Sequence, residues 1–184
     1  MDKPIVITIS GRAGVGKGLA AELLRDYFEE QECSVLITQF GDLLKYILKT
    51  FLNWDGKKDK HGRHLLQTIG TDVFRKSNPD YWVDFTLSIL DNLGGAWDVV
   101  LIPDTRFPNE ISVLENAGYK TFSILVKGKS THDRHLSQEQ LNHPSETSID
   151  DMVFDCVIEN NGTVDDFNNK LISVAKENFA NGLQ

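Results

Sequence analysis

The chain has 184 residues, and 40% of them are hydrophobic, which suffices for one domain with a buried core but not for two large ones. Its 19 basic and 27 acidic side chains give a formal net charge of −8, and such a surface repels nucleic-acid polymers and anionic membranes. The two cysteines form no paired motif, the first ten residues lack the basic segment of a signal peptide, and no apolar run reaches the length of a membrane span. We therefore expect a single cytoplasmic domain over residues 1–184, with neither a nucleic-acid polymer nor a membrane as its partner.

Apolar runs and helical spacing predict strands that alternate with helices along the chain. The predicted strands cover residues 4–10, 34–40, 97–103, 121–126 and 155–159. The predicted helices cover residues 19–31, 42–52, 63–76, 80–93, 109–117 and 165–179, and Gly118 is expected to end the helix at 109–117. The second and third strands are apolar without alternation, which predicts that both are buried on two faces.

This alternation favours an α/β fold of three layers, in which helices cover both faces of a parallel central sheet of about five strands. A binding site is then expected at the carboxyl ends of the strands. Residues 41–95 are too many for a simple crossover between two strands and predict an inserted helical lobe. Residues 127–151 are polar and contain three histidines, and we expect them to form an irregular lid or flap.

The stretch SGRAGVGKGLA at residues 10–20 joins the first predicted strand to the first predicted helix. Gly11, Gly16 and Lys17 have the spacing G-x-x-x-x-G-K of a phosphate-binding loop. Glycines let backbone N–H groups approach phosphate oxygens, while the lysine and the helix N-terminus add positive charge. We expect the phosphates of a nucleoside triphosphate to bind to Gly11, Arg12, Ala13, Gly14, Val15, Gly16, Lys17 and Gly18.

Gly18 stands where such loops carry a serine or threonine whose hydroxyl binds Mg²⁺. The metal then has to be held by phosphate oxygens, water and a carboxylate from elsewhere. Asp104 is the candidate ligand, because it follows the apolar run at 99–102 at the sheet edge where the loop is expected. A turn or a helix cap before Pro108 is the alternative role for Asp104.

Arginines are spread over the segments expected to face the cleft, which suits a protein that handles two phosphorylated ligands. They are Arg12 in the loop, Arg63 and Arg75 in the lobe, Arg106 after the third strand and Arg134 in the lid. A phosphate acceptor arrives as an anion and needs no catalytic base, so these arginines favour phosphoryl transfer to a phosphate. Asp42 and Asp104 remain candidate bases for an alcohol acceptor.

Several stretches of the sequence occur in the order typical of one family. GRAGVGKG, QFGDLLK, GRHLLQTIGTDVFR with YWVD, PDTRFPNE, HPSE and VIENNGT together resemble the deoxynucleoside monophosphate kinases of bacteriophages and their relatives. The resemblance covers nearly the whole chain. It implies a P-loop kinase fold of the adenylate-kinase type, which transfers the γ-phosphoryl group of ATP to a deoxynucleoside monophosphate with Mg²⁺ as cofactor.

The resemblance also implies roles for individual residues. Lys17, Asp104 and Arg106 would be catalytic, with Asp104 and Arg106 between the phosphates of ATP and acceptor. The acceptor would contact Phe40, Asp42, Lys45, Arg63, Gln67, Arg75, Trp82, Arg106 and Glu110, with Trp82 near its base. Gly41 and Leu43 replace an alanine and a proline of the relatives, and a helix cap is the alternative role for Glu110.

Three other functions fit part of this pattern. A P-loop kinase for phosphomevalonate or dephospho-coenzyme A would use the same cations, and a scaffold that binds nucleotides without catalysis would tolerate Gly18. A GTPase-like switch is disfavoured, because the one Asn-Lys pair, Asn169-Lys170, lies in the last predicted helix rather than after a strand. The sequence leaves open which base is accepted and whether the chain is a monomer or a homodimer.

Overall fold

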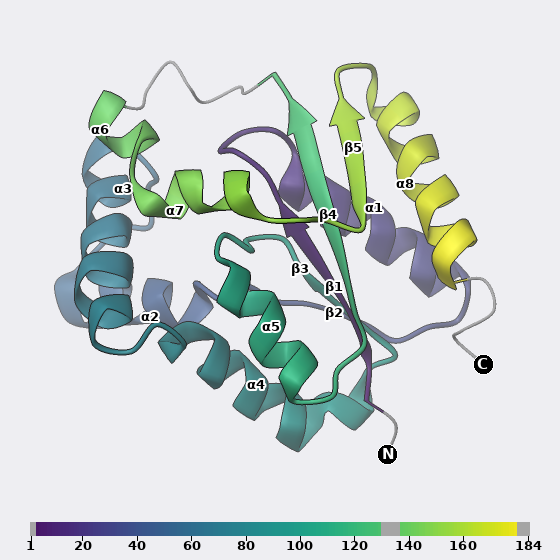
Figure 1. Cartoon of the computed structure of the whole chain (residues 1–184), viewed down its shortest axis with the longest axis horizontal. Coiled ribbons are helices and arrows are strands. Elements are labelled where there is room, and N and C mark those ends of the chain that lie inside the picture. The colour runs from purple at the N-terminus through teal and green to yellow at the C-terminus, as the bar shows by residue number, and fades with distance from the viewer. Residues whose placement is uncertain (1–2, 130–136, 180–184) are drawn as a thin grey trace.

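The computed structural model describes residues 3–129 and 137–179. In these ranges a parallel five-stranded sheet lies between two layers of helices (Figure 1). The strands are β1 (Ile5–Ser10), β2 (Val35–Ile37), β3 (Val99–Ile102), β4 (Thr121–Gly128) and β5 (Cys156–Asn160). The α-helices are α1 (Lys17–Glu30), α2 (Asp42–Leu52), α3 (Lys60–Gln67), α4 (Tyr81–Leu93), α5 (Pro108–Asn116), α6 (Gln138–Leu141), α7 (Pro144–Thr147) and α8 (Val164–Phe179). Shorter segments are the π-helix η1 (Thr68–Arg75) and the 3₁₀ helices η2 (Gly94–Ala96) and η4 (Ser148–Asp151).

The strand order is β2-β3-β1-β4-β5, and all neighbouring strands of the described sheet run parallel. All six residues of β1 are buried, because strands lie on both of its sides and helices on both of its faces. Thr8 of β1 pairs with Ile102 of β3 and with Ser123 of β4. The segments that follow β1 and β3 therefore leave the sheet at the same edge, where a binding site is expected.

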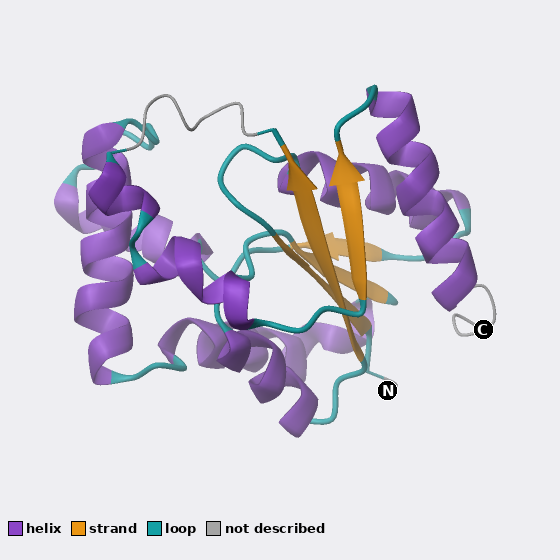
Figure 2. Ribbon diagram, turned by 45° about the horizontal axis from the view of Figure 1, so that its top comes forward, coloured by secondary structure: helices purple, strands orange, loops and turns teal. Residues whose placement is uncertain are grey.

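Two apolar cores, one on each face of the sheet, hold the helices in place (Figure 2). On one face Ile5, Ile7 and Ile9 of β1 pack with apolar side chains of α1 and α8. On the other face Val6 packs with apolar side chains of α2, α4 and α5. The alternation of side chains along β1 produces this division. The predicted three-layer α/β fold with a parallel sheet is confirmed.

The segment between β2 and β3 forms α2, α3, η1 and α4, on the opposite side of the sheet from α8 (Figure 1). The helix expected at residues 42–52 is α2, with the same bounds. The helix expected at 63–76 is two elements, α3 and the π-helix η1, whose hydrogen bonds span five residues rather than four. Within the described ranges none of the helices is both long and apolar enough to cross a membrane.

Two expectations about local structure are wrong. The strand β2 is not buried on both faces: Val35, Leu36 and Ile37 are each partly exposed, because β2 lies at the edge of the sheet and pairs with β3 alone. The segment 127–151 is also not irregular throughout, since β4 continues to Gly128 and α6, α7 and η4 follow later. Arg134, expected to act from the lid, lies outside the described residues.

Phe28 of α1 is fully buried in the first core, where its ring has edge-to-face contacts with Tyr27 and Phe179. Phe28→Ala is expected to lower the free energy of unfolding by about 3–5 kcal/mol, because it opens a cavity that the packed helices cannot close. Phe51→Ala on α2, where the side chain is 70% exposed, is the control and should change this free energy by less than about 0.5 kcal/mol. Urea unfolding measures both, and equal stability of the two variants would contradict this description of the core.

Candidate active site

The loop between β1 and α1 requires glycine at two positions. Gly11 and Gly16 have φ angles of 147° and 103°, which side chains other than that of glycine rarely permit. A Cβ at Gly11 would collide with the carbonyl oxygen of Val126, and one at Gly16 would lie 2.6 Å from Nδ2 of Asn160. The loop is therefore wrapped closely against the ends of β4 and β5.

Asn160, at the end of β5, helps to hold this loop in place. Its Nδ2 donates a hydrogen bond of 2.9 Å to the carbonyl oxygen of Val15. Arg12 of the loop also forms an exposed ion pair of 2.6 Å with Asp150 in η4. The stretch VIENNGT, which contains Asn160, was singled out from the sequence without a role for this residue, because only the parallel sheet brings the end of the last strand to a loop that lies 145 residues earlier.

Lys17 is the first residue of α1, and its side chain folds back over the loop. Its Nζ donates hydrogen bonds of 2.8 Å and 2.9 Å to the carbonyl oxygens of Gly11 and Arg12. Burial lowers the pKa of Lys17 to about 7, and the charge of Arg106 acts in the same direction. In the ligand-free protein, the amino group of Lys17 is thus hydrogen-bonded to carbonyl groups of its own loop. A phosphate bound in this loop would have to replace these contacts.

Gly18, the second residue of α1, borders open space. A Cβ built on Gly18 would meet no side chain or distant backbone atom of the described residues within 4 Å. A Cβ on Gly16, in contrast, would lie 2.6 Å from Nδ2 of Asn160. The packing of the protein therefore does not demand a glycine at this position. A serine or threonine would fit at position 18, so the fold does not explain why the hydroxyl is missing.

Two cavities meet at the carboxyl edge of the sheet. The first, which we call the loop cavity, has a volume of about 780 Å³ and is lined by the residues between β1 and α1 and by the start of α3. The second, the lobe cavity, has a volume of about 160 Å³ and lies among α2, α3, η1 and α5. The residues that line both cavities are Gln39, Lys58, Arg63, Asp104 and Arg106.

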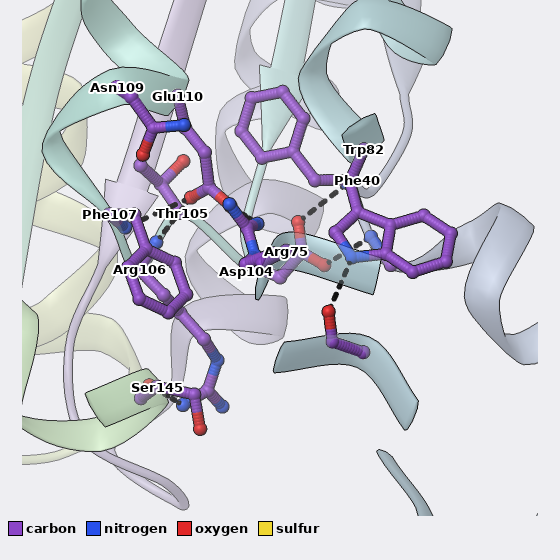
Figure 3. A network of polar contacts seen from close by, with 12 residues as sticks. Phe40, Arg75, Trp82, Asp104, Thr105, Arg106, Phe107, Asn109, Glu110 and Ser145 are labelled. Carbon is purple, nitrogen blue, oxygen red and sulfur yellow. Dashed lines mark hydrogen bonds and ion pairs between the residues drawn. The ribbon is translucent and has the colours of Figure 1, made fainter. Parts of the chain in front are cut away.

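Asp104 follows β3 and is bound to the segment that follows β2 (Figure 3). Its two carboxylate oxygens accept hydrogen bonds of 2.9 Å and 3.0 Å from the backbone N–H groups of Phe40 and Gly41. Burial raises the pKa of Asp104, while these hydrogen bonds and the charge of Lys45 oppose the shift. Asp104 does not cap α5, because that helix begins only after Phe107. Its carboxylate therefore joins two segments at the boundary of the cavities.

Arg106 extends from the end of β3 toward α7. Its Nη1 donates hydrogen bonds to the carbonyl oxygen of Ser145 and to Oε1 of Glu146, whose side chain is almost fully buried (Figure 3 shows the contact with Ser145). The residues HPSE at 143–146 thus fix the guanidinium group of Arg106. The sequence analysis identified the stretch HPSE but assigned no role to Glu146. This residue lies 40 positions after Arg106, so their contact could not be read from local sequence.

Glu110 is 1% exposed and binds three groups at once. Its carboxylate accepts hydrogen bonds from the backbone N–H groups of Arg106 at 2.6 Å and Phe107 at 3.1 Å, and it forms an ion pair with Arg75 (Figure 3). The guanidinium group of Arg75 also lies 4.2 Å from the centre of the Phe107 ring. Glu110 therefore acts both as a cap of α5 and as the partner that positions Arg75 at the wall of the lobe cavity.

Aromatic and apolar side chains form the other wall of the lobe cavity. Trp82 of α4 donates its indole N–H to the carbonyl oxygen of Gly70 in η1, at 2.9 Å (Figure 3). Phe40, Leu44 and Leu66 line the same cavity. Since the indole N–H of Trp82 is already bound, this residue contributes apolar ring surface to the cavity wall.

Four residues that were expected to contact the acceptor remain, and three of them line the lobe cavity. Lys45 lines it, and its Nζ donates to Oε1 of Gln39 and, at 2.9 Å, to Oδ1 of Asp42. Arg63 and Gln67 also line it. The carboxylate of Asp42 does not, since it faces Lys45 and the N–H of Gln39 at 2.9 Å.

Lys58 is a cavity residue that no pattern in the sequence singles out. It lies in the run KKDKHGR at 57–63, where alternating charges are typical of a solvated loop. The structure places it at the boundary of the two cavities, close to Asp104 and Arg106. Partial burial, together with the charges of Lys45 and Arg106, lowers the pKa of Lys58.

A parallel sheet of this order, with a glycine-rich loop between β1 and α1 and cations at the carboxyl edge, defines a P-loop kinase fold. Solved kinases share this fold. A gluconokinase from Sinorhizobium meliloti matches with a TM-score of 0.57 and 10% identity over 99% of both chains. The Mycobacterium tuberculosis APS kinase, solved with AMPPNP and APS, matches with a TM-score of 0.51 and 12% identity over 96% of this chain and 99% of the other.

The chain belongs to the deoxynucleotide monophosphate kinase family, whose sequence profile matches residues 28–171. It is 28% identical over 116 residues to the deoxynucleotide monophosphate kinase of Enterobacteria phage T4, which is 62% of this chain and 45% of the relative. An uncharacterized protein, ORF76 of Ictalurid herpesvirus 1, is 29% identical over 178 residues, which is 94% of this chain and 67% of that protein. The match thus spans less than half of the length of the T4 relative.

Removal of Glu110 is expected to destabilise the protein strongly. Glu110→Ala leaves the charge of Arg75 without its buried partner, and it should lower the free energy of unfolding by about 3–5 kcal/mol. Glu115→Ala on the exposed face of the same helix, where the carboxylate accepts a hydrogen bond from Thr121, is the control, with an expected loss below about 1 kcal/mol. Urea unfolding compares the variants, and a similar small loss for both would show that Glu110 does not hold Arg75.

Proposed function

We propose that this chain transfers the γ-phosphoryl group of ATP to the phosphate of a deoxynucleoside monophosphate. The observation that carries the proposal is the meeting of two cavities at Asp104 and Arg106, one built on a phosphate-binding loop and the other lined by cations and aromatic rings. ATP would bind in the loop cavity with its phosphates against residues 11–18. The acceptor would bind in the lobe cavity, so that the two reacting phosphates meet at the boundary.

The carboxylates near the boundary favour an acceptor that needs no base. Asp104 accepts two backbone N–H groups, while Glu110 and Glu146 each form an ion pair with an arginine. An alcohol acceptor would require one of these groups to remove a proton. A phosphate monoester is already a nucleophilic anion near neutral pH, since its second pKa is about 6. A phosphate acceptor therefore fits the site without any rearrangement of its carboxylates.

The walls of the lobe cavity suit a nucleoside monophosphate. Lys45, Arg63 and Arg75 supply positive charge for its phosphate, and Phe40 and Trp82 supply apolar surface for its base. Ring surfaces bind every base, so the preference among bases is left to the assay below. Membership of the deoxynucleotide monophosphate kinase family supports a deoxynucleotide as the acceptor.

Magnesium is the cofactor that we infer for the ATP phosphates. Asp104 lines the loop cavity together with Lys17, and the space beside Gly18 leaves room for water. Phosphate oxygens, waters and one carboxylate form a ligand set that Mg²⁺ prefers, so the residues present fit the metal. When bound, the metal would neutralise charge on the phosphates. Lys17 would contact the phosphates of ATP, and Arg106 would hold the transferred group.

The proposed function predicts ADP release that depends on a deoxynucleotide. Purified protein with ATP and Mg²⁺ is tested against dAMP, dGMP, dCMP, dTMP and their ribose counterparts, and one or a few deoxynucleotides are expected to give turnover. Lys17→Met should reduce the rate by at least about 100-fold, because it removes a full charge from the phosphate site. If the wild-type protein released no ADP with any of these acceptors, the proposed function would be wrong.

The lowered pKa of Lys17 predicts that ATP binding takes up a proton. With a pKa of about 7, Lys17 is largely neutral at pH 8 in the ligand-free protein, and the phosphates of ATP favour its charged form. Binding at pH 8 should therefore take up nearly one proton, and binding at pH 6 should take up far less. Calorimetry in buffers of different ionisation enthalpy measures this number, and a heat independent of the buffer at pH 8 would contradict the prediction.

A further inference from the structure

At the boundary of the two cavities lies a cation for which the described part of the chain supplies no hydrogen-bond or ion-pair partner. Lys58 lines both cavities and lies just before α3. Lys17, Lys45 and Arg106 all donate hydrogen bonds to carbonyl, amide or carboxylate oxygens. The ammonium group of Lys58 makes no hydrogen bond and no salt bridge with any residue in the ranges 3–129 and 137–179. A charge held there without a partner is available to a ligand.

The backbone on both sides of Lys58 is fixed by contacts of its neighbours. Nε1 of the buried Trp54 donates a hydrogen bond of 3.1 Å to the carbonyl oxygen of Lys57. Nε of Arg63 donates one of 2.9 Å to the carbonyl oxygen of Lys58 itself. Gly62 packs against the carbonyl group of Lys57 so closely that a Cβ would not fit. The side chain of Lys58 therefore starts from a fixed point, which favours a defined contact over a freely solvated one.

The electrostatic surroundings of Lys58 favour an anion. Its pKa is lowered by partial burial and by the charges of Lys45 and Arg106, whereas the carboxylate of Asp104 opposes the shift. The charge of Lys58 also contributes to the low pKa of Lys17 in the phosphate-binding loop. Lys58 thus interacts with charged groups of both cavities. A phosphate at the boundary would relieve the repulsion among these cations.

From these contacts we infer that Lys58 is a catalytic residue, which binds the phosphoryl group while it passes from one cavity to the other. The inference rests on the proposed function. In the transfer an oxygen of the acceptor phosphate forms a bond to the γ-phosphorus, and the bond from this phosphorus to the bridging oxygen breaks. Its electron pair leaves with ADP, and no proton has to move. An ammonium group at the boundary donates to the oxygens of the phosphoryl group when it is only loosely bonded to either substrate.

The test compares Lys58→Ala with Lys57→Ala. The control removes the same charge one residue earlier, where the ammonium group pairs with the exposed Asp55 and lines neither cavity. Lys58→Ala is expected to lower kcat by about 100-fold with both KM values within about 3-fold of the wild type. Lys57→Ala should keep kcat within about 2-fold of the wild type, and Lys58→Arg should recover part of the loss.

A binding measurement separates contact with the transferred group from a structural role. A bisubstrate analogue, in which five phosphates join adenosine to the deoxynucleoside, spans both cavities. Lys58→Ala is expected to bind this analogue at least about 10-fold more weakly, while its affinity for ATP alone stays unchanged. The melting temperatures of the two alanine variants should agree with that of the wild type.

The outcomes separate a failure of the catalytic role of Lys58 from a failure of the proposed function. A kcat of Lys58→Ala equal to that of Lys57→Ala, or a loss confined to KM, overturns the catalytic role of Lys58 and leaves the proposed function standing. Equal loss of affinity for ATP and for the bisubstrate analogue also overturns it. A wild-type protein that releases no ADP with any acceptor overturns the proposed function and this inference together.

Discussion

The carboxylate of Asp104 fixes the geometry on which both cavities depend. It accepts the N–H groups of Phe40 and Gly41, and so it binds the segment after β2 to the end of β3. The parallel register makes this possible, because β1, β2 and β3 all end at the same edge of the sheet. Lys45, one turn into α2, and Arg106, two residues beyond Asp104, take their positions from this junction. Without it, the segments after β2 and β3 would lose the hydrogen bonds that join them where the two cavities meet.

The distribution of charge shows how an acidic protein can handle anions. The chain carries a formal net charge of −8, yet lysines and arginines from five segments line the two cavities. Buried carboxylates keep two of these arginines in place, since Glu110 holds Arg75 and Glu146 holds Arg106. In the proposed reaction a phosphate at the boundary would contact Arg106 beside Glu146, whose ion pair orders this arginine before the ligand arrives.

Local patterns in the sequence were sufficient for much of the fold. The bounds of α2, the glycines of the loop and the end of α5 at Gly118 follow from apolar spacing and from backbone conformations that glycine permits. The π-helix η1 was not predictable, because its apolar spacing over eight residues resembles that of an α-helix. The exposure of β2 depends on its place at the edge of the sheet, which its own residues do not encode.

In the candidate site, too, local patterns predicted some residues, whereas others depend on tertiary contacts. Lys17, Asp104 and Arg106 follow directly from a motif or a strand end, and in the structure all of them line the loop cavity. Sequence reasoning missed Lys58 altogether and assigned no role to Asn160, because the chain looks like an ordinary charged loop or turn at these positions and only tertiary contacts bring the two residues to the site. Asp42 is the converse case: a motif suggested a ligand contact, but the side chain binds within its own turn.

The open space beside Gly18 has a consequence for how such a site can diverge. Gly11 and Gly16 are locked by the strands around them, so a change at either would require compensating changes elsewhere. No such constraint acts at Gly18, where a single substitution can introduce a hydroxyl or a carboxylate at the start of α1 while the surrounding packing stays as it is. If the site holds Mg²⁺ as proposed, evolution could therefore change the ligands of the metal while the glycines that shape the loop stay the same.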